Sequence, residues 1–189
     1  MEESLKSIMD DGEQLLWRSR PEPFETLDKT HKNSVIVKSI ITAVVTVAII
    51  TAYIIAAVRS SADMKVGLIV IILVIGGYMI ASPFLHARKL RKKAEYAITT
   101  RQLVLITDDA KGTPYDKIGV AAIRTDDDGH SSLLCGEDAI KAPAVRWRGY
   151  SMSGAHTNVD TGRCDALVFY AIPEAERVRE ILKPYLTLN

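Results

Sequence analysis

Two long apolar runs dominate the pattern of hydrophobic and polar positions along the chain. The first covers about residues 34–58 and the second residues 66–85. Each has about 20 residues or more, and a helix of that length rises roughly 30 Å, the thickness of the hydrocarbon core of a bilayer. Lys38 is the one charged residue in either run, and it lies near an end, where its long stem can carry the ammonium to the headgroups. The pattern therefore predicts two membrane-spanning helices rather than two helices buried in a soluble core, which 189 residues could not easily cover.

The link between the runs and the charges around them predict how this hairpin is oriented. Residues 59–65 are too few to allow anything but adjacent, antiparallel helices, and they carry only Arg59 and Lys65 as bases. The second run ends in a dense group of bases: His86, Arg88, Lys89, Arg91, Lys92 and Lys93. Because short cytoplasmic flanks accumulate Lys and Arg, both termini are predicted to be cytoplasmic, in a multi-pass protein of the cell (inner) membrane. We also expect the basic group to contact anionic lipid headgroups.

Small residues recur at a spacing of four within the runs, which places them on one helix face. Small side chains at that spacing let two helices approach closely. They predict either that the hairpin packs on itself near Gly76 and Gly77, or that neighbouring subunits pack through the same stripe. The residues concerned are Ala48, Ala52 and Ala56 in the first run and Gly77 and Ala81 in the second.

The N-terminal segment, residues 1–33, is acidic and contains one apolar cluster in a polar context: Leu15, Leu16 and Trp17. We expect this cluster to dock on the cytoplasmic domain, where it could cover a sheet edge; the other interpretation is an interfacial Trp at the headgroups. The segment is too charged to be a cleavable signal peptide, so the first span is expected to act as the targeting signal.

Residues 94–189 alternate between apolar and polar positions in short stretches rich in β formers. The expected strands are residues 94–99, 103–107, 114–123, 131–135, 144–150 and 165–172, with turns at 108–112 and at the Asp128-Gly129 pair. Pro173 then begins a helix whose apolar face contains Ala175, Val178, Ile181, Leu182 and Tyr185. The predicted fold class is an α+β membrane protein, in which a β-barrel or folded sheet is capped by a C-terminal helix. Residues 86–93 form a basic juxtamembrane linker before this domain.

The order of several short motifs resembles that of a known family. The motifs are GE-x-LLW-x-x-RP at residues 12–21, YAITTR at 96–101, YDKI at 115–118 and FYAIPE at 169–174, with the two-span hairpin and basic group between the first two. The chain is similar to bacterial membrane proteins with a pleckstrin-homology-like (PH-like) domain. The resemblance implies a barrel-like scaffold with a helical cap, often used in self-assembly and without common catalytic chemistry. Thr100 departs from the Asn or Asp usual in the first hairpin turn, and the polar insert at residues 151–163 is longer than usual.

Candidate chemistry is sparse. Headgroup recognition beside the first hairpin would rest on Arg101 alone, and His130, Cys135, His156 and Cys164 have spacings that fit no usual zinc pattern. If residues 144–150 form a strand, Trp147 would be buried in the core, and Arg146 and Arg148 would be solvated on the other face. The alternative is that these three side chains bind a nucleobase or a phosphate. A net charge of +1 gives no global basic field for nucleic acid.

We therefore predict no enzyme activity, metal, cofactor or specific small-molecule ligand. The expected function is a membrane-tethered PH-like interaction or scaffolding protein, forming a homo-oligomer or binding another membrane protein as well as membrane lipids. Leu15, Leu16, Trp17, Arg146, Trp147 and Arg148 are the candidate docking residues. A subunit of a channel or export system and a lipid-headgroup sensor are the alternatives.

Overall fold

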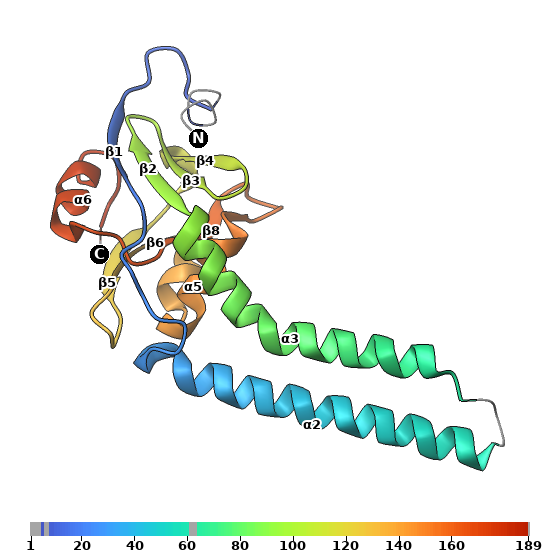
Figure 1. Ribbon diagram of the computed structural model, residues 1–189. Helices are drawn as coiled ribbons and strands as arrows, with labels where there is room; N and C mark the ends of the chain where they lie inside the picture. Colours follow the sequence, from blue (N-terminus) through green and yellow to red (C-terminus); the bar gives the residue numbers. More distant parts are fainter. Residues whose placement is uncertain (1–4, 6–7, 61–63, 189) are drawn as a thin grey trace.

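The computed structural model describes residues 5, 8–60 and 64–188. Two long helices, α2 (Lys29–Arg59) and α3 (Val66–Lys93), run side by side in opposite directions and lead into an α+β domain (Figure 1). Both predicted spans are therefore helical, although part of the predicted turn, residues 61–63, lies outside the described residues. Both helices are long and apolar enough to cross a membrane by length and composition.

Helix α3 extends well past the second apolar run. Residues 86–93, expected as a linker, continue the helix until Ala94, which directly precedes the first strand of the domain. Ala87 and Leu90 on this extension are 4% and 0% exposed, and both belong to the hydrophobic core of the domain. The basic stretch is thus a rigid helical connection, because its apolar positions have a core to pack against.

The first sheet is antiparallel and has the strand order β1-β2-β3-β4. Its strands are β1 (Leu15–Ser19), β2 (Glu95–Thr99), β3 (Gln102–Ile106) and β4 (Ala110–Pro114). Strand β1 comes from the N-terminal segment and pairs with β2, with Trp17 opposite Ile98. The third predicted strand is displaced: residues 110–114, expected partly as a turn, form β4, and Tyr115–Lys117 form a 3-10 helix, η1.

The second sheet is also antiparallel, with the order β5-β6-β8-β7. Its strands are β5 (Ala121–Thr125), β6 (Ser131–Cys135), β8 (Cys164–Phe169) and the two-residue β7 (His156–Thr157). The predicted hairpin turn at Asp128-Gly129 is confirmed, and Gly129 has the positive φ of 88° that such a turn favours in glycine. The described strands form two separate sheets, and no closed barrel is present among them.

The segment between β6 and β7 is helical, so the predicted strand at residues 144–150 is wrong. It contains α4 (Glu137–Lys141), the 3-10 helix η2 (Ala144–Arg146) and α5 (Trp147–Ser153). Pro143 precedes η2 with an extended backbone and starts the helical turns, which its fixed φ permits. The predicted insert at residues 151–163 accordingly begins inside α5.

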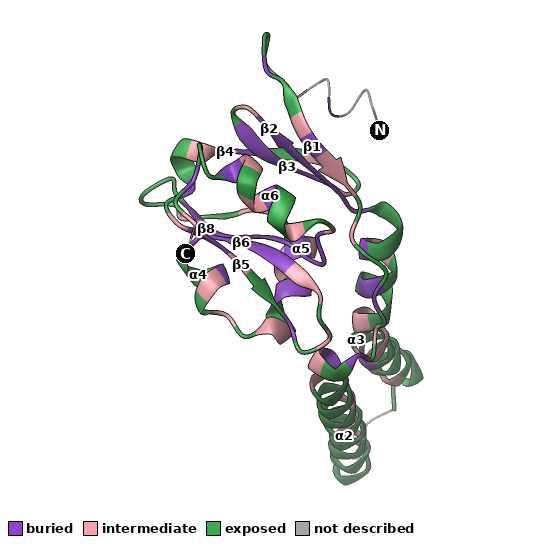
Figure 2. Ribbon diagram, turned by 90° about the vertical axis from the view of Figure 1, so that its left-hand side faces the viewer, coloured by how far each residue is buried: buried purple, intermediate pink, exposed green. Residues whose placement is uncertain are grey.

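One hydrophobic core joins both sheets to the C-terminal helix α6 (Ala175–Leu182), which begins two residues later than the predicted start at Pro173. Figure 2 shows α6 against the space between the two sheets. Trp17, Tyr96, Phe169, Val178 and Leu182 are all buried in this core. Alternate positions of β2 and β3 point the other way, and Ala97, Val104 and Ile106 pack there against Leu5. Period-two patterning thus places opposite faces of the first sheet in two clusters.

The helical hairpin packs on itself through a face other than the predicted one. Ala48, Ala52, Ala56 and Gly77 are exposed and Ala81 is only half-buried, whereas Ala57 and Gly76 are buried. A Cβ on Gly76 would lie 2.5 Å from the Thr46 hydroxyl, while one on Gly77 would meet nothing within 4 Å. The predicted self-packing through the alanine stripe is therefore wrong for this hairpin. Small residues at a spacing of four share one helix face, but the spacing does not say which neighbouring helix covers that face.

Candidate functional site

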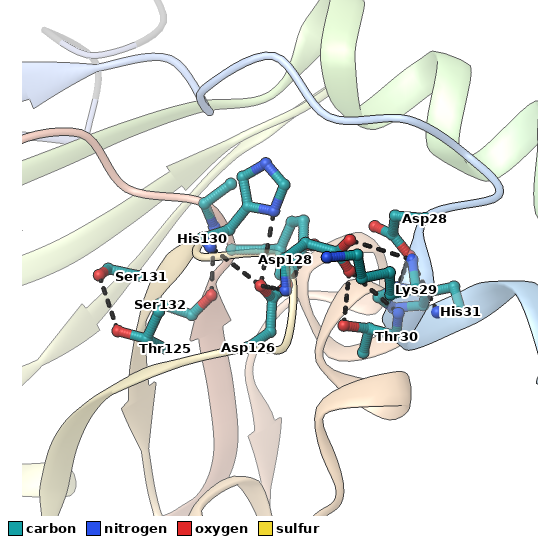
Figure 3. A network of polar contacts seen from close by, with 12 residues as sticks. Asp28, Lys29, Thr30, His31, Thr125, Asp126, Asp128, His130, Ser131 and Ser132 are labelled. Carbon is teal, nitrogen blue, oxygen red and sulfur yellow. Dashed lines mark hydrogen bonds and ion pairs between the residues drawn. The ribbon is translucent and has the colours of Figure 1, made fainter.

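The N-terminus of α2 is capped by two carboxylates, Asp28 and Asp128, that are far apart in the sequence (Figure 3). Asp28 is the N-cap residue, and its side chain accepts from the His31 backbone N–H at 2.9 Å. Asp128, in the β5–β6 turn, accepts from the backbone N–H groups of Lys29 at 3.0 Å and Thr30 at 2.9 Å. The first turn of a helix has four N–H groups without an intrahelical partner, and a negative charge there is favourable. These bonds hold the β domain directly on the end of α2.

The β5–β6 turn is itself shaped to present Asp128. The buried Asp126 carboxylate accepts from the backbone N–H groups of Asp128 at 3.0 Å and His130 at 2.9 Å. An aspartate that bonds the backbone two residues ahead is a standard turn former. Partial desolvation raises the pKa of Asp128, but the bonds from Thr30 and Lys29 outweigh it and lower that pKa to about 2. The cap is therefore ionised at neutral pH.

Arg148 on α5 links the capped helix to the core. Its guanidinium pairs with Asp28, donates to the Thr26 carbonyl at 3.3 Å, and donates to the Tyr170 hydroxyl at 3.1 Å. The Tyr170 hydroxyl in turn donates to Asp126 at 2.8 Å. The guanidinium carbon also lies 4.3 Å from the ring centroid of Phe24 and 4.9 Å from that of Tyr170, distances at which a cation is attracted to an aromatic face. Arg148 is thus a buried ion-paired residue, not the solvated neighbour of a core Trp that the sequence predicted.

Beside the Asp28–Arg148 pair, two buried nitrogens have no hydrogen-bond partner among the described residues. His31 bonds Asp28 through Nδ1 at 2.8 Å, but its Nε2 is buried and makes no hydrogen bond to the described part of the chain. The same holds for Nε of Arg148. An unmade hydrogen bond at a buried polar group costs about 1–3 kcal/mol, and more for a charged group, so these two nitrogens are candidates for an additional partner.

A cavity of about 450 Å³ lies beside these residues, between α2, α3 and α5. Its lining residues include His31, Lys38, His86 and Arg148, with Ser34, Ser39, Thr42 and Ser82 adding hydroxyls, and none of them is acidic. Val35, Ile41, Met79 and Pro83 provide apolar wall. Pro83 has no N–H for the Met79 carbonyl one turn earlier, and the Ser82 hydroxyl donates to that oxygen at 3.0 Å instead. The cavity therefore combines cationic and hydroxyl side chains with apolar ones, both at the domain end and along the helices.

The predicted docking residues do not form one surface. Trp17 is 6% exposed in the core, while Leu15 on the same strand is 43% exposed and Leu16 is half-buried. Trp147 is buried and donates from Nε1 to the Ala142 carbonyl at 3.2 Å, whereas Arg146 is exposed. Among the six, only Arg148 belongs to the cluster at the end of α2.

Part of the predicted basic group at residues 86–93 makes contacts within the protein itself. Lys89 and Lys93 pair with Asp108 in the β3–β4 turn, the latter at 2.8 Å. Their hydrogen bonds lower the pKa of Asp108 to about 2. Arg91 donates to the Phe24 carbonyl at 3.1 Å. Arg88 and Lys92 are exposed and remain the residues best placed to meet an external anion.

The other predicted chemical groups are dispersed. No group of three or more metal-binding side chains occurs in the described residues. Cys135 and Cys164 are buried free thiols, and burial raises the pKa of both, that of Cys164 to about 11. Arg101 is exposed and lies 3.3 Å from the Asp10 carboxylate, so an acid accompanies the one base of the first hairpin.

No protein-family model, curated protein or solved structure matches the chain.

The cluster around Arg148 and the cavity were not found from the sequence. Asp28, immediately before the helical run, carries a recognisable N-cap signal. Asp126 and Asp128 lie at the Asp128-Gly129 pair, which predicted only a hairpin turn. The pairing of Asp28 with Arg148 spans 120 positions and leaves no local pattern.

Proposed function

We propose that the chain is a membrane-anchored interaction protein, with α2 and α3 spanning the inner membrane and a PH-like domain fixed at the cytoplasmic face. The membrane part is supported by the exposure of apolar side chains on both helices: Ile40 is 57% exposed, Val44 62% and Val74 64%. A core helix of a soluble protein would bury such side chains, and a large exposed apolar surface in a monomer marks contact with another apolar phase. The basic end of α3 supports the cytoplasmic placement of the domain.

The observation that carries the proposal is the rigid joint between the hairpin and the domain. Helix α2 is capped by Asp128 of the β5–β6 turn, and α3 continues without a break into the core through Leu90. A domain joined at both helices has a fixed orientation relative to the membrane plane, unlike one on a flexible linker. Fixed orientation suits a scaffold, because partners then meet the same surface of every copy.

The PH-like assignment is supported by the arrangement of two four-stranded antiparallel sheets and a C-terminal helix around one core. Self-assembly is supported by the stripe of Ala48, Ala52 and Ala56, which stays uncovered by the protein's own hairpin. Close approach of a second copy is the alternative use of such a stripe.

Cysteine cross-linking in native membranes tests the self-assembly. Ala52→Cys should give a disulfide-linked dimer on mild oxidation, while Val47→Cys, exposed on another face of α2, should not. The native thiols are buried and do not interfere. Equal cross-linking of the two variants, or none with either, would contradict assembly through this stripe.

Orientation is tested with an impermeant thiol reagent on intact cells. A cysteine at Ser61 should be labelled, whereas one at Val159, which is 98% exposed in the domain, should react only after lysis. Labelling of Val159→Cys in intact cells would reverse the topology. Ion or solute flux through the reconstituted protein would instead favour the channel or export alternative.

A further inference from the structure

We infer that the cavity between α2, α3 and α5 holds the headgroup phosphate of one anionic phospholipid, with the start of its acyl chains along the hairpin. The inference depends on the membrane placement proposed above and adds a ligand to it. The PH-like domain's own first hairpin, where Arg101 is paired with Asp10, plays no part.

The charge of the cavity matches a phosphate. Its cationic side chains are Lys38 and Arg148, two histidines lie beside them, and no lining residue carries a carboxylate. Arginine and lysine bind phosphate oxygens through charge-assisted hydrogen bonds. The Arg148 charge is shared with Asp28, so Lys38, which is exposed, supplies the unshared charge among these residues.

One buried donor points to a missing acceptor. Arg148 is 8% exposed and lines the cavity, and its Nε–H has no hydrogen-bond partner in the described part of the chain. His31 is 5% exposed and lines the cavity as well, but its Nδ1 donates to Asp28, and burial lowers its pKa. Its unpartnered Nε2 is therefore the acceptor nitrogen of a neutral imidazole, which suits a headgroup hydroxyl and not a phosphate oxygen. The backbone N–H groups at the start of α2 are already taken by Asp28 and Asp128, so the helix end is not the anion site. Recognition therefore falls to side chains within the cavity.

The position of the cavity favours a lipid over a free phosphate. From His31 the lining of α2 runs through Lys38 to Thr42, about 16 Å along the helix by its rise per residue. That stretch crosses from the predicted interface into the predicted span. Ile41 and Met79 lie toward the deep end beside Ser39 and Thr42, and their apolar side chains would contact hydrocarbon there. A free phosphate would use the polar end and leave this apolar wall uncovered.

Native mass spectrometry of the purified, delipidated full-length chain tests the inference. The probes are dioleoylphosphatidylglycerol, dioleoylphosphatidylcholine and inorganic phosphate. We expect one phosphatidylglycerol to be retained per chain in preference to phosphatidylcholine, and inorganic phosphate at the same concentration not to displace it. Equal retention of the two lipids, or displacement by inorganic phosphate, would overturn the lipid assignment.

Two matched pairs of variants locate the site. Lys38→Gln should weaken phosphatidylglycerol retention about tenfold, the loss of one charge-assisted contact, whereas Lys32→Gln, also exposed on α2 but outside the cavity, should not. Gly149→Leu should reduce retention by occupying the cavity without destabilising α5, because a Cβ at Gly149 meets nothing within 4 Å. Gly77→Leu, equally open but outside the lining, is its control. If each variant behaves like its control, lipid adheres to the hairpin surface generally and the cavity is not the site.

Discussion

Asp128 accepts two hydrogen bonds from Thr30, one from the backbone N–H at 2.9 Å and one from the hydroxyl at 2.7 Å. The two residues are 98 positions apart, and their contact joins the β5–β6 turn to the first turn of α2. Removing the Asp128 carboxylate should therefore lower the stability of both the hairpin and the β domain.

Asp128→Ala should lower the free energy of unfolding by about 1 kcal/mol, the usual loss for an N-terminal capping side chain. Asp127→Ala is the matched control, because Asp127 is adjacent and exposed. Thermal unfolding of the full-length protein in detergent measures both. If the two variants have the same midpoint, the cap contributes nothing to stability.

The same contact should make stability depend on pH in a defined window. The pKa of Asp128 is about 2 in the folded protein, below the value of about 3.9 for an unfolded aspartate. Between these values the unfolded chain binds more protons, so the contribution of Asp128 is complete above pH of about 4 and is lost as pH falls through about 2. The difference in midpoint between wild type and Asp128→Asn should therefore shrink across this range, and a constant difference would contradict the assignment.

Gly76→Ala should destabilise the helical hairpin by about 1–3 kcal/mol, the usual effect of overpacking a close contact. The added methyl group would meet the Thr46 side chain, whose hydroxyl is held by a 2.7 Å bond to the Thr42 carbonyl. Gly77→Ala has open space and should be neutral or slightly stabilising, because alanine is the better helix former. Adding Thr46→Ala to Gly76→Ala should restore much of the stability in detergent unfolding assays. Equal effects of the two glycine substitutions would exclude this packing.

Trp17→Ala should lower the free energy of unfolding by about 3–5 kcal/mol, as expected for removal of a large buried side chain. Leu15→Ala on the same strand should cost much less, because Leu15 is 43% exposed. Denaturant unfolding followed by circular dichroism compares them. A small loss for Trp17→Ala would show that β1 docks without contributing to the core.

The elements that the sequence predicts well are those with a strong local period. The two apolar runs, the β2 and β3 strands and the face of α6 all follow from the spacing of their apolar residues. The segment around Trp147 was misread, because Arg146 and Arg148 on either side of an aromatic residue imitate strand alternation. Its helical state depends on Trp147 and Arg148 both finding buried partners, Ala142 nearby and Asp28 far away.

The candidate site was less predictable because it is assembled from three distant segments. Lys38 was recognised as a charge at the end of a span, but its neighbours across the cavity, His86 and Arg148, come from α3 and α5. Likewise, the spacing of Ala48, Ala52 and Ala56 places them on one helix face, whereas the actual helix contact at Gly76 depends on the rotation of each helix about its axis. Neither the neighbours across the cavity nor the rotation of the helices can be read from the spacing of residues along the chain.

The cap on α2 also fixes an order of events during synthesis. When α2 leaves the ribosome, the residue that completes its N-terminal cap, Asp128, lies 99 residues after Lys29 and has not yet been made. Strand β1 likewise cannot pair until β2, about 80 residues later, has been made. Asp28 cannot form its ion pair until Arg148 has been made. The hairpin is therefore synthesised before its N-terminal end can close, and with the membrane placement proposed above it would enter the bilayer first. Any factor that engages the nascent segment at residues 13–28 acts before the C-terminal domain is complete.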